Sequence, residues 1–253
     1  AFRLGDRVGV MSGGRLLQYD RPEVLLTRPA DPFVSQLTGS ADRAATYQDL
    51  LKSPHDEAIF AHFATSQLAR LALDGTVTNI GTSAIVSGAT VSPDGQWMLV
   101  TTLARPFSYS VTLNFFPTRI EVWTPDGRVV RTLASRPLIE RVSWGSDGAQ
   151  SGPRNPQWRA DHAASLVWIE ALDNGDPTKQ VPKRDRILAL AAPFTGDPST
   201  LVETEWRARG IAWGRSDLAI ATETNGRRRK TRTWASGPTC NASPRPLWER
   251  SPG

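Results

Sequence analysis

Short apolar segments separated by Asp-Gly turns are the feature that most constrains this chain, and they begin after Thr65. Residues 68–73 and 76–80 flank Asp74-Gly75, which suits a β-hairpin because glycine accepts the positive φ angle of a tight turn. Further segments of this kind predict strands at 97–100, 119–124, 128–133, 166–169, 187–190, 201–205 and 218–221. Because no strong helical pattern separates them, the sequence predicts an all-β sandwich, barrel or propeller.

A weak internal repeat favours the propeller among these folds. Its three copies begin near Ser92, Trp158 and Trp213, and each has an aspartate in a turn before an apolar strand. The copies lie about 55 to 65 residues apart, within reach of a four-stranded blade with long loops. We expect the tryptophans to fill the space between blades rather than to stack on a ligand. The isolated aspartates are expected to shape turns and not to bind calcium.

Composition excludes several classes of protein. The chain has 253 residues, of which 39% are apolar and 22% charged, so it is neither membrane-spanning nor plainly disordered. Its single cysteine, Cys240, excludes an internal disulfide framework and is expected to be a free thiol. The net charge of +5 is scattered apart from residues 227–230, which we interpret as a solvated turn. We therefore expect no nucleic-acid partner.

The first 43 residues follow a different pattern. Two apolar segments around Gly13-Gly14 predict a hairpin, and Asp20 and Asp31 each precede a proline that suits the first turn of a helix. Gly39 can end the second helix. The stretch RLGDRVGVMSGGRLLQYDRPEVLLTRPADPFVSQLTG resembles the C-terminal part of an ABC transporter ATP-binding subunit of the osmoprotectant or polyamine importer type.

That resemblance implies the last hairpin and helices of an ATPase core, without its chemistry. The phosphate cradle of such an ATPase needs a GxxxxGK[ST] string, which the chain does not contain. An ordinary αβ surface segment is the alternative for residues 1–43. The next residues predict a short helix from Thr46 and another that Ser53 caps, with Pro54 at its first position.

Within that second helix, Ile59 and Phe63 stand four residues apart and are expected to face one side. His55 and His62 are expected to be surface or packing residues, because neither has a partner at metal-ligand spacing.

Residues 46–253 carry a second resemblance. The stretches VSPDGQWMLV, RIEVWTPDGRVVRTLA, RDRILALAAPFTGDP and GIAWGRSDLAIATE resemble the N-terminal propeller of prolyl-oligopeptidase-like serine peptidases. The likeness is to the bacterial glutamyl-peptidase or dipeptidyl-aminopeptidase-like branch. It implies a propeller that stands before an α/β-hydrolase domain and restricts which peptides reach the active site. We therefore predict a mainly β chain, with a partial β-propeller of about three to four blades at 44–253, preceded by a short α+β segment at 1–43.

The hydrolase chemistry is not expected within these residues. A nucleophilic serine needs a GxSxG elbow, and the nearest string, residues 81–85, lacks the final glycine. No histidine follows His162. We therefore assign no catalytic, cofactor-binding or metal-binding residue, and we expect the chain to lack the hydrolase domain and to be inactive alone. The expected partner is a peptide substrate, which this chain would bind by way of the missing hydrolase domain.

Four residues are tentative substrate contacts: Arg105, Tyr109, Arg184 and Arg186. A guanidinium group can pair with a peptide carboxylate, which suits a glutamyl preference. The structural alternative is an Arg-Asp pair that pins a blade loop.

Three functions remain open at this point: the access-restricting propeller of a serine peptidase, a non-catalytic peptide-binding propeller module, and a remnant of an ABC transporter subunit. The two resemblances meet near residues 43–46 without a Pro/Gly linker, which suggests a gene-fusion remnant or an artefact. A partial propeller exposes apolar faces, so we predict a marginal, aggregation-prone protein. The sequence contains no secretory signal or long apolar run, so the compartment is cytoplasmic by default, or periplasmic if the parent peptidase is exported.

Overall fold

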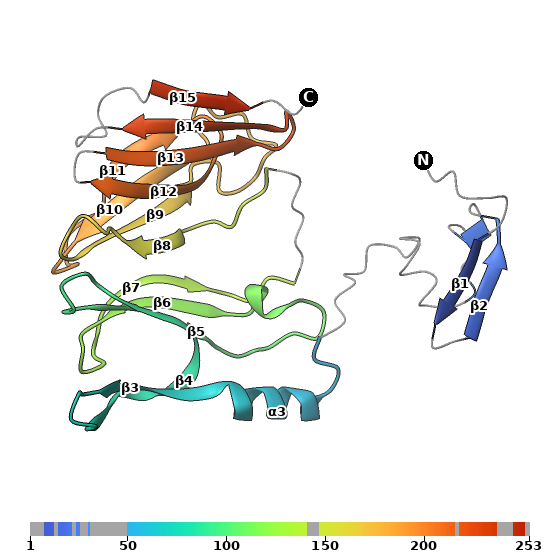
Figure 1. The fold of residues 1–253 in the computed structure, drawn as a ribbon, viewed down its shortest axis with the longest axis horizontal. Coiled ribbons are helices and arrows are strands. Elements are labelled where there is room, and N and C mark those ends of the chain that lie inside the picture. Colours follow the sequence, from blue (N-terminus) through green and yellow to red (C-terminus); the bar gives the residue numbers. More distant parts are fainter. Residues whose placement is uncertain are drawn as a thin grey trace. The chain divides into compact units, whose positions relative to one another are not determined.

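The computed structural model describes residues 8–12, 15–21, 24–25, 30, 50–140, 147–215, 218–236 and 245–250 (Figure 1). Contacts divide the chain into two units. The first holds residues 1–51 and 109–112, and the second holds residues 52–108 and 113–253. The division after Leu51 lies close to the join expected at residues 43–46, whose origin stays a prediction. Within the described residues, no helix has both the length and the apolar character needed to cross a bilayer.

The first unit contains the predicted hairpin. Strand β1 (Val8–Ser12) pairs antiparallel with β2 (Arg15–Asp20), as the Gly13-Gly14 pair predicts. Val10 and Leu25 are buried against each other, and the described part of the first predicted helix is helical at residues 24–25. The helices predicted to begin at Asp31 and Thr46, and the expected helix end at Gly39, lie outside the described residues.

Helix α3 (Pro54–Ala64) begins where the sequence predicts. The hydroxyl of Ser53 accepts a hydrogen bond from the Asp56 N–H at 3.2 Å, and Pro54 occupies the first helical turn. The expected apolar side of this helix is not buried, because Ile59 and Phe63 remain 42% and 80% exposed. Phe60 makes the packing contacts instead, with ring centroids 5.1 Å from Phe107 and 6.1 Å from Phe116. His55 and His62 are both exposed.

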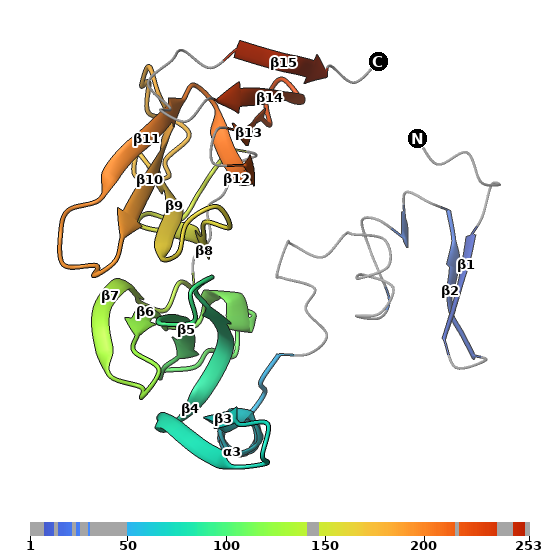
Figure 2. The same cartoon turned by 60° about the vertical axis from the view of Figure 1, so that its left-hand side comes forward.

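Three antiparallel sheets make up most of the second unit, in agreement with the mainly β prediction (Figure 2). In each sheet the strands lie side by side in sequence order. The first sheet contains β3 (Thr65–Leu71), β4 (Val77–Val91), β5 (Met98–Leu103), β6 (Thr118–Trp123) and β7 (Val129–Arg136), with a 3-10 turn at Leu113–Phe115. The second contains β8 (Arg154–Trp158), β9 (Ser165–Ala171), β10 (Asp185–Ala191) and β11 (Ser199–Thr204). The third contains β12 (Arg207–Arg215), β13 (Leu218–Asn225), β14 (Lys230–Ser236) and β15 (Arg245–Arg250).

Strand β9 shows how the second sheet is positioned. Its side chains alternate between the two faces of the sheet, as strand geometry requires. Leu166 and Trp168 join a buried cluster with Leu99, Ile120 and other residues of the first sheet. Val167 and Ile169, on the opposite face, join a second cluster with residues of the third sheet, among them Ala208, Ile211, Ala219 and Ala221. The second sheet is therefore packed on both faces.

Aromatic residues fill the space between sheets, as expected. Phe194 is fully buried, and its ring lies 5.1 Å from that of Trp97 and 5.9 Å from that of Trp158. Trp168 belongs to the same cluster, whereas Trp213 packs against the cluster on the other face of the second sheet.

Of the three repeated aspartates, Asp94 shapes a turn as the sequence analysis expects, Asp161 pairs with Arg159 in the turn before β9, and Asp217 lies outside the described residues. Oδ1 of Asp94 accepts hydrogen bonds from the Ser92 hydroxyl at 2.5 Å and from the Gln96 N–H at 3.0 Å. In the same way, Asp74 accepts from the Thr76 N–H and Asp176 from the Thr178 N–H, each at 2.9 Å. Residues 227–229 form an exposed turn between β13 and β14, which agrees with the solvated turn predicted there.

Candidate functional site

The structure places Arg105 and Tyr109 in different units of the chain. Arg105 forms an ion pair with Glu57 of α3, and its guanidinium lies 4.8 Å from the ring centroid of Phe107. Its side chain is nevertheless 58% exposed. Tyr109 falls in the first unit and is 44% exposed. The role of both residues as substrate contacts stays a prediction.

Arg184 and Arg186 lie on either side of Asp185, and each has an acidic partner on or just after strand β9. Nη1 of Arg184 lies 2.8 Å from Oδ2 of Asp173, in the loop after β9. Nη2 of Arg186 lies 2.8 Å from Oε2 of Glu170, its cross-strand neighbour on β9. The contacts of Arg184 fit the structural alternative, an Arg-Asp pair that pins a loop, and its role as a substrate contact also stays a prediction.

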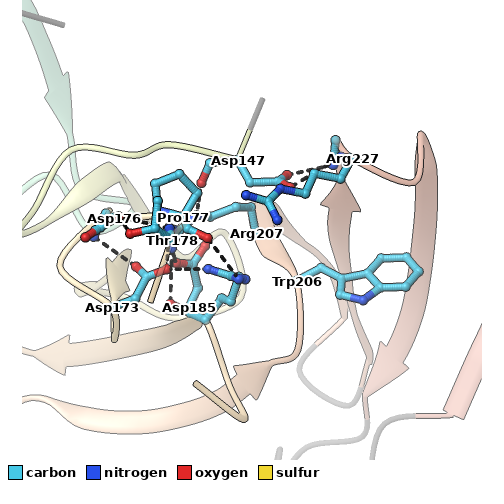
Figure 3. Close-up of polar contacts among 12 residues, drawn as sticks. Asp147, Asp173, Asp176, Pro177, Thr178, Asp185, Trp206, Arg207 and Arg227 are labelled. Carbon is cyan, nitrogen blue, oxygen red and sulfur yellow. Dashed lines mark hydrogen bonds and ion pairs between the residues drawn. The ribbon is translucent and has the colours of Figure 1, made fainter. Parts of the chain in front are cut away.

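A buried charge network, centred on Arg207, joins the second sheet to the third (Figure 3). Arg207 is 3% exposed and extends from the start of β12 toward two aspartates. Its Nη1 lies 2.9 Å from Oδ1 of Asp185, and its Nη2 lies 2.6 Å from Oδ2 of Asp173. Its Nε donates to the Asp147 carbonyl at 2.6 Å. A single guanidinium therefore holds two strands and two loops together.

The chain itself supplies donors to every carboxylate oxygen of the two central aspartates. Oδ2 of Asp185 accepts from the Ala208 N–H at 2.7 Å and lies 2.7 Å from Nη2 of Arg154. Oδ1 of Asp173 accepts from the Gly175 N–H at 2.9 Å. Buried carboxylates are stable only when they are paired in this way. Because their acceptor sites are occupied, the network is suited to fixing the sheets rather than to proton transfer or ligand binding.

The third sheet has a buried carboxylate of its own. Glu223 accepts hydrogen bonds from the Trp206 N–H at 2.9 Å and from Nε1 of Trp234 at 3.0 Å. The Arg232 guanidinium lies 3.6 Å from the ring centroid of Trp206, close enough for a cation–π interaction. Arg232 also donates a hydrogen bond to Glu205. This bond, together with the nearby Lys183, holds the pKa of Glu205 below its usual value.

A pocket of about 280 Å³ lies between the edge strands β8 and β12. It is lined by Asn155, Gln157, Val167, Trp168, Ile169, Arg209, Gly210 and Ile211. Two side-chain amides connect the strands across it: Nδ2 of Asn155 donates to the Arg209 carbonyl at 3.3 Å, and Nε2 of Gln157 donates to the Ile211 carbonyl at 2.6 Å. Among the eight described lining residues, Arg209 brings the only charge.

The sequence analysis missed this pocket because it missed both strands that form it. Pro156 interrupts β8, and Gly210 and Gly214 interrupt β12, so neither segment has a clear alternation of apolar and polar residues. The Asn155-Pro156 pair and Gly210 were the available signals, since such residues mark β-bulges when they fall inside a strand.

Comparison with known proteins relates most of the chain to an endopeptidase. It is 39% identical over 227 residues to the "Probable glutamyl endopeptidase, chloroplastic" of Arabidopsis thaliana, and 37% identical over 227 residues to the rice protein of the same description. Each match covers 88% of this chain and 24% of the relative, so the chain spans about a quarter of the length of these relatives. No family model matches the chain.

Among solved structures, the Pyrococcus horikoshii acylaminoacyl peptidase has a partial likeness to this chain. It matches with a TM-score of 0.41 and 11% identity, over 73% of this chain and 30% of that one.

The described residues of the second unit form three antiparallel sheets, and the middle one is packed on both faces. Most of this chain is homologous to part of two proteins described as probable glutamyl endopeptidases, which agrees with the peptidase resemblance of residues 46–253. Both relatives are plant proteins, so the bacterial branch named from the sequence finds no support in them. The ABC-transporter resemblance of residues 1–43 finds none either and stays a prediction.

Proposed function

We propose that these residues form the propeller part of a glutamyl-endopeptidase-like serine peptidase, where they restrict which peptides reach the catalytic domain. The homology to probable glutamyl endopeptidases supports the choice of enzyme. The proposed role is one of access, because the 253 residues contain no GxSxG elbow.

The packing of the second sheet on both faces is the observation that carries this proposal. A two-layer sandwich buries only one face of each sheet, and a barrel closes one sheet on itself. In a propeller, by contrast, each blade is a sheet of strands in sequence order that packs between two neighbours. The alternating contacts of Leu166 to Ile169 on β9 fit that third arrangement.

A chimera tests the proposal. The homologous segment of the Arabidopsis relative is replaced by residues 52–253 of this chain, and cleavage of a short glutamyl peptide is compared with cleavage of a folded protein. We expect the peptide to be cut and the folded protein to be spared, and we expect this chain alone to cut neither. A folded chimera that degrades both substrates equally well would contradict the proposal.

A non-catalytic peptide-binding module is a second candidate, favoured by the pocket between β8 and β12. It predicts measurable peptide affinity in the chain alone. The two candidates are compatible, because a propeller that admits peptides can also bind them.

A further inference from the structure

Two β-bulges face each other across the pocket between β8 and β12. On β8, the three steps from Arg154 to Gln157 oppose only two steps on β9, so β8 contains one extra residue. On β12, the two steps from Ala208 to Gly210 oppose one step on β13, which leaves Arg209 as the extra residue. Bulges of this kind change the direction in which a side chain points and are common at sheet edges and next to binding sites.

The backbone at the first bulge is in an unusual conformation. Asn155 has a φ angle of 49°, in the left-handed region that non-glycine residues rarely adopt. Its side-chain amide donates to the carbonyl of Arg209, the extra residue of the second bulge. Each bulge therefore stabilises the other, and the geometry at Arg209 is set by both sheets.

Arg209 differs from the arginines of the buried network in having no countercharge among the residues that the structure describes. Its side chain is exposed, and its Nε donates to the Thr224 hydroxyl at 2.6 Å. Within the described part of the chain, its Nη1 and Nη2 have no acceptor. One hydrogen bond, from Nε, therefore holds the side chain in place, while Nη1 and Nη2 can pair with a carboxylate.

We propose that this pocket binds the carboxylate of an extended peptide, with Arg209 as the residue that pairs with it. A volume of about 280 Å³ is just below the range of pockets that enclose a whole small-molecule ligand, and it suits one acidic side chain. The neighbouring backbone is suited to an extended ligand, because β8 and β12 are the terminal strands of their sheets. The proposal rests on the proposed function only in its choice of a peptide as the ligand.

A second pocket of the same volume provides the comparison. It lies on the first sheet, and its lining includes both Arg70 and Asp126. An anionic ligand there would meet a carboxylate as well as a guanidinium. The pocket at Arg209 is the better anion site, because its lining brings a cation without an acid.

Calorimetry on the full chain with two capped peptides tests this site. The probes are acetyl-Ala-Ala-Glu-Ala-Ala-amide and the same peptide with glutamine in place of glutamate. We expect the glutamate peptide to bind at least about tenfold more tightly, the usual effect of a charge-assisted pair. The variant Arg209→Gln should abolish that preference, and Arg209→Lys should keep only part of it because lysine cannot pair in the forked geometry.

The matched control is Arg70→Gln, which removes the same charge from the other pocket. It should leave the preference for glutamate unchanged, and all variants should retain the circular dichroism spectrum of the parent chain. Equal affinity for the two peptides in the parent chain, or an equal loss in Arg70→Gln and Arg209→Gln, would overturn the proposal. The two tests are independent. If calorimetry shows no preference for glutamate, the chimera can still spare folded proteins, and if the chimera cuts folded proteins, the chain alone can still prefer the glutamate peptide.

Discussion

Arg207 on β12 and Asp185 on β10 form a buried ion pair of 2.9 Å that joins two sheets of the second unit. Neither group can be solvated where it lies, since Arg207 is almost fully buried and Asp185 is completely buried. Each group therefore depends on the other for stability, and the same guanidinium also serves Asp173.

Removing the guanidinium should destabilise the fold strongly. We expect Arg207→Met to lower the free energy of unfolding by about 3–5 kcal/mol, because it leaves Asp173 and Asp185 buried without their shared cation. Urea denaturation measures the change. The control is Arg209→Met two residues along the strand, an exposed position where the effect should stay within about 0.5 kcal/mol. Equal unfolding midpoints for the two variants would show that the network does not hold the sheets together.

Gly127 should tolerate no side chain. Its φ angle is 90°, and a Cβ atom there would lie 2.1 Å from the Gly81 nitrogen. We expect Gly127→Ala to cost about 1–2 kcal/mol for the left-handed backbone and about 1–3 kcal/mol more for the overlap. Thermal unfolding measures the sum.

A second turn separates these two costs. Gly95 has a φ angle of 73°, but a Cβ atom there would meet nothing within 4 Å. Gly95→Ala should therefore show the backbone cost alone. If the two variants unfold at the same temperature, the contact between Gly127 and Gly81 contributes nothing to stability.

Acid should weaken the fold through its turns. The Ser92 hydroxyl and the Gln96 N–H lower the pKa of Asp94, and the Thr76 N–H and hydroxyl lower the pKa of Asp74. When the folded pKa lies below the unfolded value of about 3.9, the stabilisation is fully present above that value and is lost as the pH falls through the folded pKa. The urea midpoint should thus drop as the pH falls below about 4, the unfolded pKa, and less steeply in Asp94→Asn. An identical pH dependence in that variant would exclude a contribution from Asp94.

The aromatic packing between the first and second sheets gives another test. Phe194 has no exposed surface and contacts Trp97 and Trp158. We expect Phe194→Ala to cost about 3–5 kcal/mol, since it removes the ring and leaves a cavity. Phe63→Ala removes the same ring from an exposed position on α3 and should change stability little. Denaturant unfolding measures the loss of stability in both variants. An equal loss in the two would show that burial of the Phe194 ring does not account for the effect.

Local signals explain which parts of this fold the sequence predicts. The hairpins around Asp74-Gly75 and Pro125-Asp126-Gly127 and the start of α3 at Ser53 each depend on a few neighbouring residues, and all three are present. The strands β8 and β12 pair with the strands that follow them, β9 and β13, but a bulge in each removes the regular alternation that would mark a strand.

The same distinction applies to the sites. The Arg184-Asp185-Arg186 cluster is visible in the sequence, but its partners Arg207 and Arg154 lie more than twenty residues away along the chain and were not foreseen. The pocket at Arg209 depends on two bulges that lie opposite each other, and the residues that mark each bulge do not indicate that the two meet. Of the tentative contacts, Arg105 and Tyr109 lie in a short stretch of the sequence, and their role as substrate contacts stays a prediction.

Exposed apolar side chains on the first sheet should make the protein self-associate. Leu71 at the end of β3 and Val77 at the start of β4 are 71% and 63% exposed, and the intervening turn exposes Leu73. Clustered apolar surface of this kind favours association of copies. We expect the double variant Leu71→Lys, Val77→Lys to reduce concentration-dependent sedimentation while leaving the urea midpoint nearly unchanged, because neither side chain is buried. Val129→Lys, at an exposed position on β7, is the control for added charge alone. A double variant that sediments like the parent chain would contradict the expected aggregation through this surface.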